Sequence, residues 1–409
     1  MSKARRWKSM AIACCGLALA ASLATPMEGA GAQERPVEPA QLPPAPADYT
    51  PRKTAWGDWD FTGTWPYDYP PAARILFQRP EGYGDRLWLT PEEHAKRLEN
   101  AAKSDASFSR ENAGITRQAG TQGLTDWMKR SRFAWRTSLL TSPRNGQLPA
   151  LTPQGEALFK AGRSSWVPKQ TFDFPDDFDT WDRCVTRGFP ASMFPNRYNN
   201  ALRIHQSPGY IVIMLEMLGT RIIPIVDKAD VGRHWPASVE AWMGNSRAYW
   251  EGKTLVIETT NIKSGDSVAH DLTKRAAAPV IITMVGGAPR NTIPTSKKAH
   301  TIERLTMTGP NAILYEITYD DPEVFTAPWT AQVEWTRDDD YQFFEYACHE
   351  GNVQIRNYIS SSRATRAAIA RGEVDPNYSD GNQRFEGRYD SDPVAPVVPG
   401  QEPAGRDRR

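Results

Sequence analysis

Apolar and polar residues alternate with a period of two along much of the chain after residue 181, and this pattern predicts β-strands. A three-strand meander is predicted over 202–206, 210–218 and 221–226, with turns at Ser207-Pro208-Gly209 and Gly219-Thr220. Three further hairpins pair 247–250 with 254–262, 301–307 with 313–319, and 330–336 with 341–348. About nine strands joined in sequence indicate a mainly β, antiparallel, up-and-down fold. A lipocalin-like barrel is favoured because closure removes exposed edges, and a two-sheet sandwich is the alternative.

Helix signals are confined to the rest of the chain. Thr90-Pro91-Glu92-Glu93 is typical of a capped helix start and predicts a helix to about Lys103. A similar start at Thr152 predicts a short helix ending near Gly162, and 361–370 predicts a third helix. We therefore expect an N-terminal α/coil region over 53–172 that packs on the barrel of 173–360. Residues 361–409 would form a short helix and a disordered tail.

The first residues predict export. Lys3, Arg5, Arg6 and Lys8 precede an apolar run over 10–24, and small residues around Ala32 suit cleavage. Residues 1–32 are interpreted as a Sec signal peptide and 33–52, rich in Pro and Ala, as a flexible linker. A twin-arginine signal and lipidation at Cys14 are the alternatives. The apolar run is too short to span a bilayer, so we expect a periplasmic or secreted protein without stable membrane insertion.

Removing the signal changes charge and cysteine content. Residues 1–32 hold four Lys or Arg and one Glu, so the formal net charge falls from +1 to −2. A near-neutral chain has no footprint for nucleic acid. Cys184 and Cys348 remain, and an even pair in an oxidising compartment predicts a disulfide. The 14 tryptophans indicate a large core or an aromatic ligand platform.

One strand carries a carboxylate among apolar neighbours. Glu216 follows Tyr210, Val212 and Met214 at alternate positions, so it shares their face. If that face lines a cavity, Glu216 is desolvated and suits general acid or base catalysis. The alternative is a structural ion pair with Arg203 or Arg221.

The predicted strand that ends near Cys348 carries a second cluster. Glu345, Tyr346, His349 and Glu350 combine carboxylates, a phenol and an imidazole at a strand end and the turn after it. His349 is the preferred acid or base because its pKa is ordinarily near neutral. The alternative is that the residues serve only the disulfide and a turn.

A third cluster is polar and basic. A Cys184–Cys348 bridge would bring Arg183 and Arg187 to His349 and Glu345, where they could hold a carboxylate or stabilise an oxyanion. Asn199, Asn200, His205 and Glu350 complete the predicted substrate-binding set.

The known catalytic motifs are absent from the sequence. It has no nucleophile elbow, no zincin motif, no phosphate loop and no dinucleotide fingerprint. No cofactor is predicted. A metal held by His205, Glu216 and His349 is an alternative without a supporting spacing. The strand carboxylates Glu258, Glu303, Glu316 and Glu334 are interpreted as a solvated face.

Several motifs from 181 to 352 carry a family resemblance: Trp181-Asp182-Arg183-Cys184, Gln206-Ser207-Pro208-Gly209-Tyr210, Trp250-Glu251-Gly252-Lys253-Thr254, Pro328-Trp329-Thr330 and Tyr346-Ala347-Cys348-His349-Glu350-Gly351-Asn352. In these the chain resembles a large family of secreted bacterial proteins. The resemblance covers less than half of the chain and implies no particular reaction.

The sequence thus predicts an exported protein that binds a small, largely apolar or aromatic molecule in a β-barrel cavity. Cofactor-independent acid/base catalysis of the lyase, hydratase or isomerase type is expected, with His349, Glu216, Glu345 and Tyr346 as catalytic groups. The alternatives are a non-catalytic carrier of a hydrophobic ligand and a carbohydrate-active protein.

Overall fold

The computed structural model describes a subset of the chain: residues 49–66, 73, 75–111, 123–161, 171–178, 182–186, 188–195, 199, 201–263 and 295–375. The chain divides into two units, Met1–Arg35 and Pro36–Arg409, and every described residue lies in the second. The predicted signal peptide, most of the predicted linker and most of the predicted tail lie outside the described residues.

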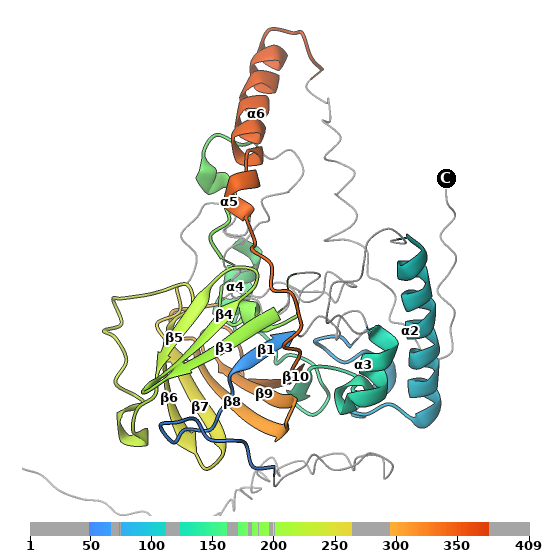
Figure 1. Cartoon of the computed structure of the whole chain (residues 1–409). Coiled ribbons are helices and arrows are strands. Elements are labelled where there is room, and N and C mark those ends of the chain that lie inside the picture. The colour runs from blue at the N-terminus through green and yellow to red at the C-terminus, as the bar shows by residue number, and fades with distance from the viewer. Residues whose placement is uncertain are drawn as a thin grey trace, which may run out of the picture. The chain divides into compact units, whose positions relative to one another are not determined.

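The described strands form two antiparallel sheets that face each other (Figure 1). The four-stranded sheet has the order β1 (Gly63–Pro66), β3 (Ala201–Ser207), β4 (Tyr210–Leu215) and β5 (Thr220–Pro224). The six-stranded sheet has the order β2 (Leu140–Ser142), β10 (Trp329–Thr336), β9 (Ala312–Asp320), β8 (His300–Gly309), β7 (Thr254–Thr260) and β6 (Asn245–Glu251). The antiparallel, mainly β fold predicted from the sequence is confirmed.

The two sheets meet at their edges without closing into a barrel. At one seam Val226 N donates to Ala248 O at 2.8 Å, and at the other Asp338 N donates to Thr64 O at 2.9 Å. The edge strands β1 and β5 both end in proline, which has no N–H to extend a ladder. Among the described residues, the closed barrel is therefore wrong, and the two-sheet alternative describes the fold.

Hairpins were predicted best, because local turn chemistry defines them. The meander β3–β4–β5 and the hairpins β6–β7 and β8–β9 are all present. Gly209 and Gly252 adopt φ values of +76° and +62° in their turns, a conformation that glycine adopts without a steric cost.

Aromatic side chains fill the space between the sheets. The inner faces of both sheets contribute to one hydrophobic core, in which Trp65, Trp329 and Trp335 are fully buried. Tyr315 stacks on Trp335 with ring centroids 4.5 Å apart, an offset arrangement that aromatic pairs favour. Much of the tryptophan content therefore serves packing.

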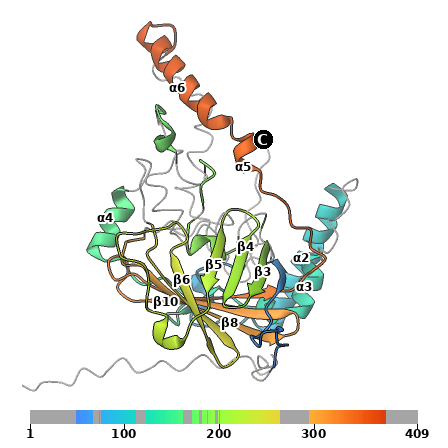
Figure 2. The same cartoon turned by 60° about the vertical axis from the view of Figure 1, so that its left-hand side comes forward.

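Most of the helices lie beside the sheets, and the last one extends away from them (Figure 2). They are α2 (Pro91–Glu111), α3 (Leu124–Arg130), α4 (Pro153–Ala161), α5 (Cys348–Gly351) and α6 (Gln354–Ala370). Five short 3-10 helices cover Glu81–Tyr83, Arg132–Trp135, Pro175–Asp177, Ala191–Met193 and Lys228–Asp230. The predicted capping box starts α2, since Thr90 N donates to Glu93 Oε2 at 2.8 Å and Glu93 N donates to Thr90 Oγ1 at 3.3 Å. None of the described helices is both long and apolar enough to cross a membrane.

Three local predictions differ from the structure. Residues 341–347 form no strand after β10, because hydrogen bonds to a buried carboxylate, described below, hold this segment away from a sheet ladder. The last helix begins at Gln354, seven residues before the predicted start. The region 53–172 supplies β1 and β2 to the two sheets, in addition to helices and coil.

Candidate functional site

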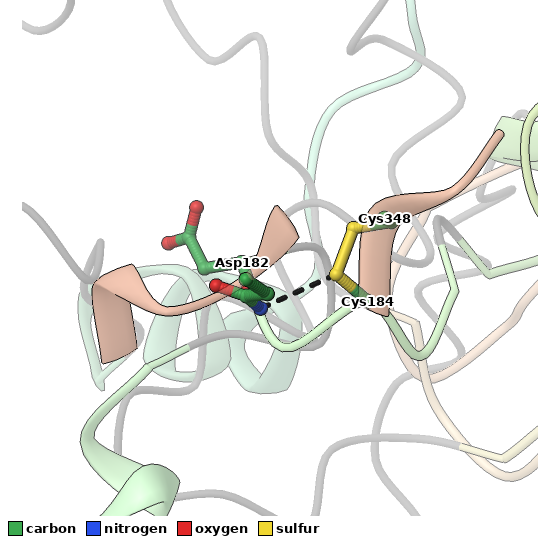
Figure 3. The surroundings of a disulfide bond; sticks show 4 residues. Asp182, Cys184 and Cys348 are labelled. Atoms are coloured by element: carbon green, nitrogen blue, oxygen red, sulfur yellow. Dashed lines mark hydrogen bonds between the residues drawn. A yellow bond between two sulfur atoms is a disulfide. The ribbon is translucent and has the colours of Figure 1, made fainter. Parts of the chain in front are cut away.

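A disulfide joins the two halves of the predicted site (Figure 3). Cys184 and Cys348 are bonded, with 5.7 Å between their Cα atoms and a separation of 164 positions in sequence, which confirms the predicted pairing. Asn352 Nδ2 donates to Asp182 O at 2.7 Å and to Cys184 Sγ at 3.2 Å. Asn352 therefore fixes α5 and α6 to the segment 182–186 beside the bridge.

The predicted catalytic residues near the bridge lie at the surface. His349 and Glu350 are exposed on the single-turn helix α5, Glu345 is exposed before it, and Tyr346 is half-buried. The His349 side chain is therefore open to solvent, unlike that of a buried acid or base.

The predicted anion-binding residues are only partly described. Arg183 Nη1 donates to Asp176 Oδ1 at 3.1 Å, so this guanidinium binds a carboxylate of the protein itself. Asn199 is half-buried with a φ of +51°. Arg187 and Asn200 lie outside the described residues.

Glu216 is buried and serves as a structural clamp. Its Oε2 accepts from Ala201 N at 3.0 Å and from Tyr341 OH at 2.9 Å, and its Oε1 accepts from Phe344 N at 3.0 Å. These bonds tie the segment after β10 to β3 and β4. Both carboxylate oxygens are occupied, which leaves Glu216 poorly placed to exchange protons with a substrate.

Arg221, one of the predicted partners of Glu216, instead forms a buried ion pair across the two sheets. Its Nη1 donates to Glu303 Oε1 at 2.8 Å and its Nη2 to Glu303 Oε2 at 2.5 Å, a bidentate geometry. Tyr315 OH donates to Glu303 Oε1 at 2.9 Å, and the Phe189 ring lies 4.4 Å from the guanidinium carbon. Burial alone would lower the pKa of Arg221, but the charge and hydrogen bonds of Glu303 raise it. The prediction that Glu303 lies on a solvated face is wrong.

The outward face of β3–β4–β5 is a surface of nine side chains, which we call the outer grid. The strand register places them in three cross-strand rows: Ser207, Tyr210 and Pro224; His205, Val212 and Ile222; Arg203, Met214 and Thr220. Tyr210, Met214 and Ile222 are 48%, 37% and 68% exposed. Apolar side chains from two strands therefore adjoin one another at the surface, beside the exposed imidazole of His205.

One rim of the outer grid is built by the segment that Glu216 clamps. The Arg203 guanidinium carbon lies 4.8 Å from the centre of the Phe343 ring, and Arg203 Nε donates to Thr64 Oγ1 at 3.2 Å. Phe343 lies two residues after Tyr341, which donates to Glu216. The clamp therefore holds the segment that places the Phe343 ring beside the Arg203 cation, at the rim of an apolar surface.

Sequence reasoning also missed a histidine–carboxylate pair on the other sheet. His300 Nε2 lies 3.0 Å from Glu258 Oε1 on the outward face of β7 and β8, where Glu258 was interpreted as a merely solvated carboxylate. Alternation along both strands could have placed the two residues on one face, but their pairing depends on the register between strands 40 residues apart.

Two broader tests complete the description. Across the part of the chain that the structure describes, no three His, Cys, Asp or Glu side chains gather as a metal site requires. Comparisons of the chain with protein-family models, with characterised proteins and with solved structures find no match.

Proposed function

We propose that this chain is an exported binding protein that holds a small, largely apolar or aromatic molecule on the outer grid. The observation that carries the proposal is the exposure of Tyr210, Met214 and Ile222 around Val212 on a regular sheet surface. Contiguous exposed apolar surface is unfavourable in water and commonly marks a binding site. The Cys184–Cys348 bridge supports export, because disulfides persist in oxidising compartments.

The outer grid is better suited to a ligand than the space between the sheets. The inward side chains of β3–β4–β5, such as Ile204, Ile213 and Ile223, belong to the packed aromatic core. A ligand there would have to displace close-packed side chains, at a cost that a small molecule seldom recovers. A ligand on the outer face removes apolar area from water without such displacement.

Two polar groups would orient the ligand. His205 lies directly across from Val212, the central residue of the grid, and Arg203, with the Phe343 ring beside it, lies directly across from Met214. An aromatic molecule with one polar or anionic substituent matches this arrangement, since its ring can cover the apolar side chains while its substituent meets the cation. The proposal requires no reaction at Glu216 or His349, and so corresponds to a carrier.

Fluorescence titration of the mature chain tests the proposal. The probe is N-phenyl-1-naphthylamine, an uncharged aromatic amine whose emission rises on apolar surfaces. Ile222→Ser should weaken binding about fivefold, because partial burial of an isoleucine contributes about 1 kcal/mol. The matched control is Ile302→Ser, which changes a 39% exposed isoleucine on the outward face of the six-stranded sheet.

The titration distinguishes three outcomes. Weaker binding in Ile222→Ser with unchanged binding in Ile302→Ser locates the ligand on the outer grid. Equal affinities in both variants and the unmodified chain refute the proposal. Displacement of the probe by saccharides, and not by aromatic compounds, would favour the carbohydrate-active alternative.

A further inference from the structure

The His300–Glu258 pair has the geometry of an oriented base. The side chains are 33% and 25% exposed, so solvent or a substrate can reach the pair. A carboxylate at Glu258 accepts a hydrogen bond, so the 3.0 Å contact favours the proton on His300 Nε2. His300 Nδ1 then carries the lone pair, and Glu258 would stabilise the imidazolium formed when Nδ1 takes a proton.

A third residue, Arg247, lies beside the pair. Arg247 on β6 is directly across from Glu258 on β7, and Glu258 is directly across from Ile302 on β8, two residues after His300. Among the described residues Arg247 forms no hydrogen bond or ion pair, and its Nε is buried without a partner. A guanidinium with free donors is suited to a planar oxyanion, above all a carboxylate.

Across β6, β7 and β8 the groups therefore follow one another as a cation (Arg247), a carboxylate (Glu258) and a base (His300). Asp320 on β9 lies directly across from His300 and is a further charged residue beside the base. Arg247 could bind one end of a small molecule while His300 Nδ1 faces a neighbouring atom.

We propose that Arg247, Glu258 and His300 form an acid/base site for small 2-oxo acids. Arg247 binds the substrate carboxylate. His300 Nδ1 takes a proton from the carbon next to the keto group, the C–H electron pair moves into the carbonyl to give an enolate, and Glu258 stabilises the resulting imidazolium. Return of a proton to the enolate oxygen completes a keto–enol tautomerisation, and return to carbon exchanges the hydrogen; neither outcome needs an oxidant, a reductant or a metal. The site is on a different sheet from the outer grid, so the two proposals can fail separately.

Two readouts on the mature chain test the site, with pyruvate as the probe. Deuterium incorporation at the methyl carbon of pyruvate in D₂O, followed by proton NMR, measures proton removal. Perturbation of the His300 ring signals in a histidine-labelled sample measures binding, with benzoate as a carboxylate that has no exchangeable carbon proton. Near-UV circular dichroism confirms that each variant is folded.

The variants separate the three roles. His300→Gln should lower the exchange rate about 100-fold or to the buffer background, the effect expected for a lost base. Glu258→Gln should lower the rate at saturation while binding is retained. Arg247→Met should raise the half-saturating pyruvate concentration about tenfold with little change in the rate at saturation, because it removes binding that is uniform along the reaction.

Arg304→Met is the matched control, since Arg304 also lies on the outward face of β8 but is paired with Glu251. It should leave exchange and binding unchanged. The proposal is overturned if pyruvate and benzoate leave the His300 signals unmoved, or if Arg304→Met has the effect of Arg247→Met. Binding without exchange above background overturns the role of His300 as a base.

Discussion

Replacing Glu303 with glutamine should destabilise the protein strongly, because it leaves a buried cation without its counter-charge. Arg221 and Glu303 have side chains that are 1% and 0% exposed, and the pair joins the two sheets. The glutamine has nearly the same shape and can still accept from Tyr315 OH through its carbonyl oxygen. The perturbation therefore removes charge with little change in packing.

The magnitude follows from desolvation. Breaking a buried ion pair by removing one partner typically costs about 3–5 kcal/mol, because the remaining charge is uncompensated in a low-dielectric interior. Ser246 and Thr259 hydroxyls lie within hydrogen-bond distance of Arg221 Nη2 but carry no charge to replace the carboxylate. Since domains are stable by about 5–15 kcal/mol in all, Glu303→Gln should remove a large fraction of the free energy of unfolding.

Replacing both partners should be far less harmful than replacing one. The double variant Arg221→Met/Glu303→Leu leaves no buried charge, and such apolar replacements are often neutral or stabilising. Its free energy of unfolding should therefore lie within about 1 kcal/mol of the unmodified chain or above it. Asp230→Asn is the surface control, because the exposed Arg233–Asp230 pair should contribute about 0–1 kcal/mol.

Urea unfolding of the protein measures these differences. Far-UV circular dichroism and tryptophan fluorescence should give coincident transitions, and the midpoints and slopes then give the free energies. The reasoning is refuted if Glu303→Gln shifts the midpoint no more than Asp230→Asn. It is also refuted if the double variant is as unstable as the single one.

Three more predictions concern the bridge, a buried histidine and the clamp. Replacing Cys184 with serine should lower the free energy of unfolding in urea by up to about 5 kcal/mol, the chain-entropy value for so long a loop. By mass spectrometry, the unmodified protein should be about two hydrogens lighter without reductant than with it. Burial and the charge of Arg97 lower the pKa of His94, whose ring stacks 3.7 Å from that of Trp135, to about 4, and NMR titration should show this value. The free energy of unfolding should fall as pH drops from about 6.5 towards 4, because the histidine of the unfolded chain is protonated first. The variant His94→Phe should remove this dependence. Glu216→Gln replaces one acceptor with a donor and should cost about 1–3 kcal/mol, read by urea unfolding, with loss of hydrogen-exchange protection at Phe344 N; unchanged protection there would contradict the clamp.

The features predicted correctly from the sequence are those that depend on neighbouring residues. Turn residues such as Gly209 and Gly252 defined hairpins, and Thr90 with Glu93 defined a helix start, because each acts over a few positions. The disulfide followed from compartment and cysteine count. None of these predictions required the relative positions of distant segments.

The features that were wrong or missed depend on contacts across the fold. Residues 341–347 are rich in the aromatic residues that favour strands, yet Phe344 N donates to Glu216, 128 residues away. The choice between a barrel and two sheets depended on which strands form the sheet edges, and strand order follows from contacts between distant segments. His349 was favoured by its chemistry, but its exposure on a single helical turn could not be read from the motif.

The alternation of side chains along a strand shows which face of the sheet a residue lies on, and composition alone does not give this information. On β8, Glu303 shares its face with Leu305 and Met307, which are buried, so the alternation already placed this carboxylate inside. On β7, Glu258 lies on the face opposite to that of Leu255 and Ile257, which are buried, so the same rule placed it outside. Two glutamates on adjacent strands therefore have different roles. Glu303 is buried, so Arg221 must neutralise its charge for the fold to be stable. Glu258 lies on the outer face, where it can orient His300. A carboxylate in a strand is therefore best assigned to structure or chemistry by its face, and only then by its neighbours in sequence.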